Sequence, residues 1–361
     1  MIPPELTLIG VVLAGCGFYL FKKNPEKLRN EIEGGFERRL SMSGYVRTEY
    51  PKWSWSFSRR QIFQACPRRY YYNYYGSHNG WEPNAPQEAA LAYRLKKLTN
   101  IYLTLGNALH QTAERLALRV AEGRQPFSAS EAEEMIRRQL RRVWRSSRDQ
   151  RRLFLQRPNR VDMLHEFYYG RGLSEDVVEL INQRAKQVAA ALTTSATWEE
   201  LAAKGSKLIA AEQFDTFELR GTSVYAVPDL LFRTEKGFWL IVDWKTGELA
   251  LENQEQLALY ALYVLQKHGV KPEKIKARLE YLSLAEVLEL SFSRQELELV
   301  AEKAFQSMEE MRGFLADPEL NAPKSPAHFP LTNQRRQCPS CNFYELCREE
   351  LKQDPAPPEV S

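Results

Sequence analysis

The chain has few cysteines and no phosphate-binding loop. Five cysteines among 361 residues, without regular pairing, argue against a fold that depends on disulfides. No stretch matches G-x-x-x-x-G-K-[ST], which excludes an ATPase motor of the P-loop type. The net charge of +4 is too small to indicate a nucleic-acid partner by itself. The remaining composition, 43% hydrophobic and 27% charged, is that of a globular protein with one large core or two modest ones.

Long apolar runs are also missing, except at residues 6–21. This uncharged run of 16 residues precedes Lys22 and Lys23 and is about the shortest that can span a membrane. It predicts a single-pass anchor in residues 1–24, at the inner or plasma membrane, with the following chain in the cytoplasm. The alternatives are a buried or mis-annotated extension and a cleaved signal peptide, which fits less well because the start lacks basic residues. The polar residues 25–55 then predict a linker.

The most informative pattern is a pair of apolar runs, Tyr225–Phe232 and Phe238–Trp244, that flank a turn-forming cluster with a glycine. It predicts a β-hairpin, whose second strand is apolar on both faces and therefore central and covered. Asp243 and Lys245 come at the end of that strand, and residues two apart in a strand point to the same face. Asp229 lies on the neighbouring strand. We therefore expect these three charged side chains to project together.

Charged groups at the end of a buried strand are costly to desolvate unless they have partners or a ligand. Two carboxylates beside a lysine suit Mg²⁺ or Mn²⁺ bound to a phosphate, with the lysine orienting an attacking water or helping to deprotonate it. The alternative is a surface hairpin with a solvated Asp–Lys pair. A D-x-K triplet on its own fits that alternative more often.

The residues around this triplet favour the metal site. Pro228-Asp229 followed by Asp243-Trp244-Lys245 resembles the core motif of the PD-(D/E)xK nucleases. The resemblance extends over roughly residues 56–347 and includes several motifs in the same order.

Two helical motifs extend the resemblance. Downstream, Gln256 and Tyr260 match the superfamily's Q-x-x-x-Y helix, and their spacing places them on one helical face. Upstream, Gly106 and His110 match the G-x-x-x-H helix of the RecB/AddB-like branch.

Three cysteines near the C-terminus, Cys338, Cys341 and Cys347, have the spacing C-x₂-C-x₅-C. A fourth ligand is needed, and Cys66 is the only candidate outside the N-terminal apolar run. Four thiolates suit either a [4Fe–4S] cluster or structural Zn²⁺. Zinc ribbons usually use two close pairs, whereas one distant cysteine with a C-terminal trio is similar to the iron–sulfur subgroup. That subgroup includes the AddB nuclease domain and the small exonucleases of CRISPR adaptation.

The resemblance implies an α/β fold with a restriction-endonuclease-like core, which is a mixed sheet flanked by helices. A nuclease domain would span residues 56–350, with a helical insert at about 122–205 and a cluster-binding end at 338–347 that joins the N- and C-terminal parts. The polar, proline-rich residues 351–361 predict a disordered tail.

The resemblance also implies roles for individual residues. Asp229 and Asp243 would hold the metal ion, His110 would be its third ligand, and Lys245 would position the water. Supporting roles fall to Gln256, Tyr260 and Glu212, the last of these on a strand predicted at 207–220.

The predicted activity is metal-dependent hydrolysis of phosphodiester bonds in DNA, single-stranded or at duplex ends. We expect an exonuclease-like role in DNA repair, recombination or processing. The alternatives are a catalytically silent DNA-binding iron–sulfur module, against which the intact Asp229, Asp243 and Lys245 argue, and an RNA-directed nuclease. No motif identifies a helicase or CRISPR partner. One departure from the family pattern, Ala226 and Val227 where many RecB-like members carry a glycine, concerns the fine geometry of the substrate.

Two further segments are rich in basic or aromatic residues. Residues 137–160 contain ten arginines and one acid, Asp149, which indicates either a solvated helical face or a track for DNA. Residues 68–75 combine two arginines with five tyrosines. These rings either stack on bases or face the core, and the core is the more common place for them.

Overall fold

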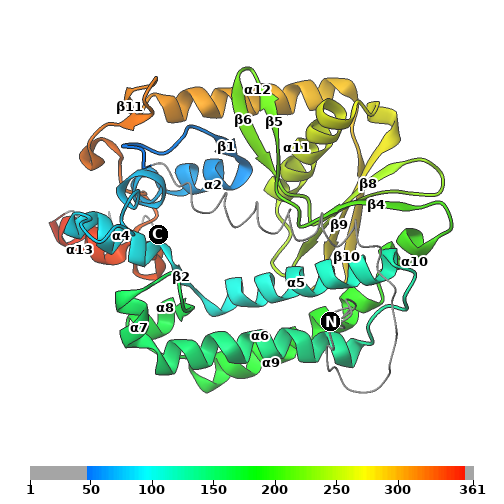
Figure 1. Ribbon diagram of the computed structural model, residues 1–361, viewed down its shortest axis with the longest axis horizontal. Helices are drawn as coiled ribbons and strands as arrows, with labels where there is room; N and C mark the ends of the chain where they lie inside the picture. Colours follow the sequence, from blue (N-terminus) through cyan, green and yellow to red (C-terminus); the bar gives the residue numbers. More distant parts are fainter. Residues whose placement is uncertain (1–46, 354–361) are drawn as a thin grey trace, which may run out of the picture. The chain divides into compact units, whose positions relative to one another are not determined.

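The computed structural model describes residues 47–353, and the chain divides into two units, Met1–Thr48 and Glu49–Ser361. The second unit contains a five-stranded sheet with the order β10-β9-β8-β7-β4 (Figure 1). β8 and β9 run parallel and the other neighbours run antiparallel, so the predicted α/β fold with a mixed sheet is confirmed. The strands are β4 (Lys207–Ala211), β7 (Leu230–Arg233), β8 (Trp239–Lys245), β9 (Ile275–Tyr281) and β10 (Glu286–Ser291).

β7 and β8 form a hairpin at the predicted turn. Leu230 pairs with Val242 in the antiparallel register. The backbone N–H of Thr234 donates to the carbonyl of Phe238, with 2.8 Å between nitrogen and oxygen. Gly237 has a φ of 77°, a conformation that glycine adopts without the steric cost of a Cβ.

The first apolar run of the prediction is not one strand. It ends at Ala226, and Pro228 separates it from β7 because proline lacks the N–H that a central ladder needs. The strand predicted at 207–220 is also divided, so that Glu212 lies between two sheets. The second sheet has the order β1-β6-β5, with β1 (Trp55–Ser56), β5 (Asp215–Leu219) and β6 (Thr222–Ala226).

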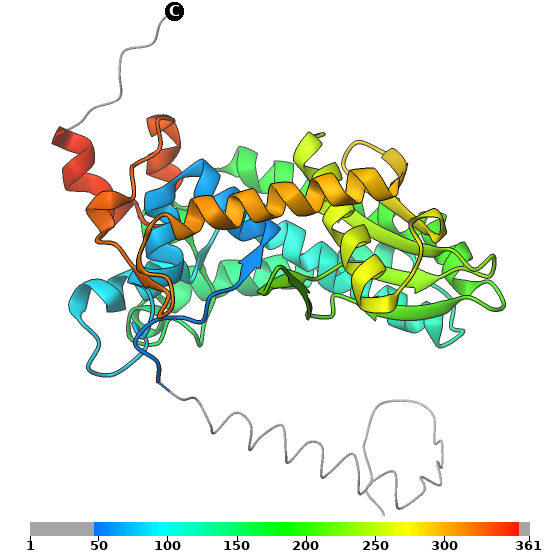
Figure 2. The same ribbon diagram turned by 90° about the horizontal axis from the view of Figure 1, so that it is seen from above.

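Helices cover both faces of the five-stranded sheet. α11 (Leu251–His268) and α12 (Arg294–Arg312) pack on one face, and α5 (Ile101–Ala121) packs on the other (Figure 1). Seen from above, α12 extends beyond α11 (Figure 2). Successive residues of β8 alternate, since Ile241 packs in the core with α11 while Val242 packs in the core with α5. Asp243 and Lys245 therefore share the α11 side.

Residues 122–205 are mostly helical. The stacked indoles of Trp198 and Trp244, with ring centroids 5.4 Å apart, join this region to the sheet. A short parallel pair, β2 (Leu98–Thr99) and β3 (Met163–Leu164), connects it to the preceding residues. Its helices are α6 (Ala129–Asp149), α7 (Arg151–Gln156), α8 (His165–Tyr168), α9 (Glu175–Thr193) and α10 (Thr197–Ala202).

The residues after β1 pack against the C-terminal part of the described chain. Buried Arg68 donates from Nε to the carbonyl of Phe329 at 2.8 Å and forms an ion pair with Glu350 at 2.5 Å between nitrogen and oxygen. Tyr70, Tyr72 and Tyr75 are buried, so most of the tyrosine run belongs to the core. The elements of these two parts are α2 (Phe57–Ala65), α3 (Pro67–Tyr71), η1 (Tyr72–Gly76), α4 (Gln87–Lys96), β11 (Leu315–Asp317), β12 (Ala322–Pro323), η3 (Pro326–His328), η4 (Arg335–Ser340) and α13 (Tyr344–Gln353). The short helix η2 (Pro272–Lys274) lies elsewhere, directly before β9.

The expected transmembrane character is contradicted. Within residues 47–353, no helix is both long enough and apolar enough to cross a membrane. The two helices of 21 residues, α5 and α6, are amphipathic and carry charged side chains on their exposed faces. The predicted anchor, residues 6–21, lies outside the described residues. We therefore withdraw both the anchor and the membrane location that depended on it.

Replacement of Trp198 by alanine tests how the helical region is held to the sheet. The change removes the partner of Trp244 in the core, and we expect a loss of about 3–5 kcal/mol in the free energy of unfolding measured in urea. Leu299→Ala is the matched control, because that side chain on α12 is 56% exposed, and its effect should stay within about 0.5 kcal/mol. Equal effects of the two changes would contradict this account of the packing.

Candidate active site

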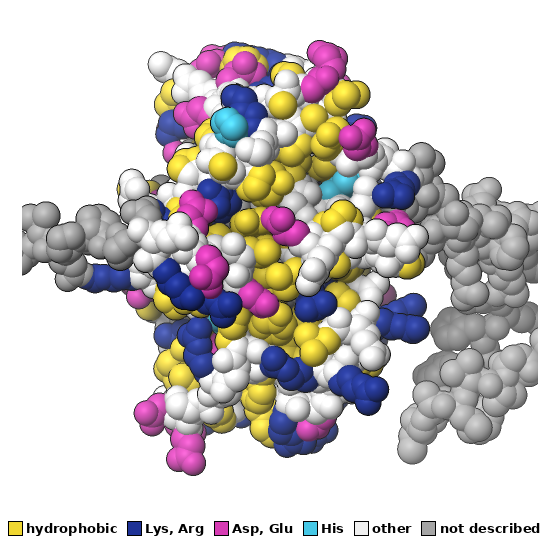
Figure 3. Space-filling model, turned by 90° about the vertical axis from the view of Figure 1, so that its left-hand side faces the viewer, with side chains coloured by type: hydrophobic (Ala, Val, Ile, Leu, Met, Phe, Trp, Pro, Cys, Tyr) yellow, Lys and Arg dark blue, Asp and Glu magenta, His cyan; other side chains and the backbone are white. Residues whose placement is uncertain are grey.

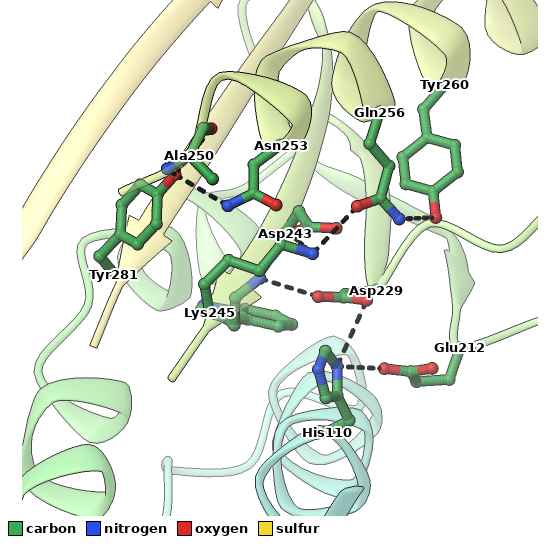
Figure 4. Close-up of polar contacts among 11 residues, drawn as sticks. His110, Glu212, Asp229, Asp243, Lys245, Ala250, Asn253, Gln256, Tyr260 and Tyr281 are labelled. Carbon is green, nitrogen blue, oxygen red and sulfur yellow. Dashed lines mark hydrogen bonds and ion pairs between the residues drawn. The ribbon is translucent and has the colours of Figure 1, made fainter. Parts of the chain in front are cut away.

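Three side chains from separate elements meet beside the sheet (Figure 4). His110 comes from α5, Glu212 directly follows β4, and Asp229 directly precedes β7. The Nδ1 atom of His110 lies 2.8 Å from Oε1 of Glu212 and 3.3 Å from Oδ1 of Asp229. Within residues 47–353, this is the only group of three or more His, Cys, Asp or Glu residues whose ligand atoms all lie within 4.8 Å of one another. One imidazole and two carboxylates can hold a divalent metal ion.

Glu212 reaches this group through an unusual backbone conformation. Its φ is 49°, in the left-handed region, which costs of the order of 1–3 kcal/mol for a residue other than glycine. The pairing of β4 with β7 is irregular between Leu208 and Ala210. The backbone N–H of Glu212 then donates to the carbonyl of Asp229 at 3.0 Å between nitrogen and oxygen. The strained turn therefore holds the two acidic residues side by side.

Asp243 is the most deeply buried charge of the site, with 1% of its surface exposed. Neither carboxylate oxygen takes part in a well-aligned hydrogen bond, although the ammonium of Lys245 forms an ion pair with Oδ2 at 2.7 Å. Asp229 is better satisfied, because its Oδ2 accepts the backbone N–H of Trp244 at 2.8 Å. Buried carboxylate oxygens without hydrogen-bond donors, like the two of Asp243, are able to coordinate a metal ion.

A chain of hydrogen bonds leads from Lys245 into α11. The Lys245 ammonium donates to Oε1 of Gln256 at 3.0 Å, and Nε2 of Gln256 donates to the hydroxyl of Tyr260 at 2.9 Å. The i,i+4 spacing of the glutamine and the tyrosine makes this chain possible. Lys245 is thus fixed between Asp243 and Gln256 (Figure 4).

The pKa values show how strongly these groups interact. Burial, and then repulsion from Asp229, raise the pKa of Asp243 to about 7, although Lys245 opposes the shift. Burial alone would lower the pKa of His110, but attraction to Asp229 and Glu212 outweighs it and raises this pKa to about 10. Burial would likewise lower the pKa of Lys245, and Asp243 and Asp229 raise it instead. A bound divalent cation would take the place of the protons that these interactions favour.

The structure brings together every residue that the sequence placed at the site, in a slightly different grouping. The predicted metal ligands were His110, Asp229 and Asp243. The three residues whose ligand atoms lie closest together are His110, Glu212 and Asp229. Asp243 is outside this group and lies between Asp229 and Lys245, with which it interacts.

Sequence reasoning missed Glu280, which lies behind the site. Its Oε2 accepts the indole N–H of Trp244 at 3.1 Å, and its Oε1 accepts the hydroxyls of Ser195 at 2.8 Å and Thr197 at 2.7 Å. The sequence held one indication of this role, because Glu280 is the single acid within the largely apolar stretch 277–282.

Four free cysteines form a second polar cluster. Cys66 lies between α2 and α3, Cys338 is in η4, Cys341 follows it, and Cys347 is in α13. Burial, and then the neighbouring thiols Cys341 and Cys66, raise the pKa of Cys347 to about 12. Burial also raises the pKa of Cys341 and of Cys338, and Cys66 contributes to both shifts. The four residues therefore lie close together.

The basic residues of the segment 137–160 have two kinds of surroundings. Several form ion pairs within the protein, such as Arg137 with Glu133 and Arg148 with Asp149. Arginines also line a groove of about 690 Å³ between α5 and α6, and three of these, Arg138, Arg141 and Arg142, form ion pairs as well. Basic side chains gather over the lower part of the face shown in Figure 3. The arginines of the groove are Arg115, Arg138, Arg141, Arg142, Arg145 and Arg160. The solvated face and the track for DNA both stay predictions.

Comparison with known families gives one match that covers most of the chain. The PD-(D/E)XK nuclease superfamily matches residues 54–348, a range that contains all the site residues and the four cysteines described above. Comparison with curated proteins found no match. The mixed sheet flanked by helices is consistent with this superfamily. With the match extending from before α2 into α13, the chain belongs to the PD-(D/E)XK nuclease superfamily.

Proposed function

We propose that the protein is a metal-dependent nuclease that hydrolyses phosphodiester bonds in DNA, with an exonuclease-like role in repair, recombination or processing. The observation that carries this proposal is the buried Asp243 carboxylate, which lies beside both the His110 group and Lys245. Membership of the superfamily supports a nuclease. The choice of DNA over RNA, and the RecB/AddB-like branch, are part of the proposal and rest on the motifs around His110 and Gln256.

The side chains divide the work in this proposal. His110, Glu212, Asp229 and Asp243 would hold Mg²⁺ or Mn²⁺. When bound, the ion would supply Lewis-acid stabilisation and lower the pKa of a bound water. The Lys245 ammonium, held by two acceptors, places a positive charge where the attacking water and the scissile phosphate would lie. Gln256 orients the lysine, and Tyr260 orients the glutamine.

We also propose that the four cysteines ligate a [4Fe–4S] cluster. Zinc ribbons usually use two close pairs of cysteines, whereas this chain combines the distant Cys66 with a C-terminal trio, and this spacing supports the cluster over a zinc ion. Such a cluster would join the turn between α2 and α3 to α13, next to the ion pair of Arg68 with Glu350.

The first test of the active site is Asp243→Asn, which keeps the shape of the side chain and removes its charge. Changes behind a metal site cost about 10-fold to 100-fold, and loss of a ligand should cost at least about 100-fold in cleavage rate. The measurement is cleavage of labelled DNA and RNA after chelation and re-addition of Mn²⁺. Asp149→Asn on the exposed end of α6 is the control and should keep the normal rate. Normal cleavage by D243N would disprove the site, and preference for RNA would disprove the choice of substrate.

Gln256→Met tests the orientation of Lys245. Methionine has a similar length but makes neither hydrogen bond, so the lysine loses one of its two anchors. We expect a fall of about 10-fold to 100-fold in kcat with unchanged Mn²⁺ affinity in titration calorimetry. Weakened Mn²⁺ binding would instead place Gln256 among the determinants of the metal site.

Cys66→Ser tests the cluster. Protein purified without oxygen should be brown and contain iron and sulfide, and the variant should lose iron and also have a lower Tm. The reason is that the cluster closes a long loop between residue 66 and the C-terminal trio. Cys16→Ser, which alters the remaining cysteine, should keep its iron. A colourless protein with stoichiometric zinc, or full iron content in the C66S variant, would contradict the assignment.

A further inference from the structure

Aromatic rings and basic side chains alternate along a ladder that the nuclease motifs do not include. The ring of Phe214 meets the ring of Tyr225, with centroids 4.9 Å apart. The guanidinium carbon of Arg59 lies 5.5 Å from the Tyr225 centroid and 4.4 Å from the Tyr74 centroid. The ammonium of Lys96 lies 5.5 Å from the same Tyr74 centroid. Four segments distant in sequence therefore contribute to one continuous row of contacts.

This ladder begins next to the metal-binding group. Phe214 is two residues after Glu212, and Tyr225 is four residues before Asp229. Phe214 is 61% exposed, so one end of the ladder offers a ring to solvent beside the site. The other end reaches α4, where Lys96 is also exposed.

Among the described residues, the positive charges of the ladder have no acidic partner. In the part of the chain from 47 to 353, neither Arg59 nor Lys96 nor the adjacent Lys97 forms an ion pair with a carboxylate. Partial desolvation of the ammonium, and then repulsion from Lys97 and Arg59, lower the pKa of Lys96 to about 8. Cations held close together without an acid are stabilised by an anion, and the anion available to a nuclease is the backbone phosphate.

We propose that this ladder binds a single-stranded segment of the nucleic acid beside the catalytic centre. The inference rests on the proposed nuclease function. Bases stack on Phe214 and on the accessible parts of Tyr225 and Tyr74, and phosphates contact Arg59, Lys96 and Lys97. Rings interleaved with cations bind a single strand without sequence preference, because every base has a face that can stack. A duplex cannot use the rings in this way because its base faces are already stacked on each other.

The test compares Phe214→Ala and Lys96→Gln with the unaltered full chain. Binding of fluorescent oligo-dT is measured by anisotropy over a range of salt concentrations, and a blunt duplex of equal length is measured in parallel. Stacking on one aromatic side chain is worth about 1–3 kcal/mol, so F214A should weaken oligo-dT binding at least about fivefold and leave duplex binding unchanged. K96Q should lower the slope of log K against log salt by about 0.7.

The matched control is Lys276→Gln. Lys276 also lies over a ring, 4.6 Å from the Phe238 centroid, but on β9 away from the ladder, and its loss should change neither affinity nor slope. Hydrolysis of bis(p-nitrophenyl) phosphate, a diester too small to reach the ladder, should be unchanged in all three variants. Unchanged oligo-dT binding in both ladder variants, or an equal loss on duplex, would overturn the ladder. Wild-type protein that binds oligo-dT through the ladder but cleaves neither substrate would instead overturn the proposed nuclease function.

Discussion

The constraint on which this site depends is the burial of the Asp243 carboxylate at the end of a central strand. Burial of a charge is costly unless the group is paired, and here neither oxygen has a well-aligned hydrogen bond. Lys245 offsets part of this cost through its ion pair, and is itself held by Gln256. The remaining cost is what a divalent cation would relieve. The burial that spaces these charged groups would therefore also favour the binding of a metal ion.

The sheet makes this arrangement possible because β8 alternates between two packed layers. Trp244 packs in the core with α5, while its neighbours Asp243 and Lys245 face α11. The indole of Trp244 is fixed by Glu280 and by the ring of Trp198, and its backbone N–H holds Asp229. One residue of the motif thus positions the Asp229 carboxylate, directly before the neighbouring strand. This explains why the helical region around Trp198 matters to a site that it does not touch.

The errors of the sequence-based prediction have physical reasons. The apolar run before Asp229 was predicted as one strand, but Pro228 ends its pairing, and the two parts belong to different sheets. The strand predicted at 207–220 is divided as well, and Glu212, which lies between its two parts, contacts His110. The membrane prediction considered hydrophobicity in residues 6–21 alone. Among the helices of residues 47–353, none combines the length and the apolar character that a membrane span requires.

The sequence by itself determined the local pairings of this protein. D-x-K places Asp243 and Lys245 on one face, and Q-x-x-x-Y places Gln256 and Tyr260 on one face, because strand and helix periods act over a few residues. Only the tertiary structure decided which distant groups meet. Residues separated by about a hundred positions converge where His110 contacts Glu212, and no local period reports such a contact. The ladder around Arg59 and the hydrogen bonds of Glu280 also join residues that are distant in sequence, so they too depend on how the layers of the fold pack together.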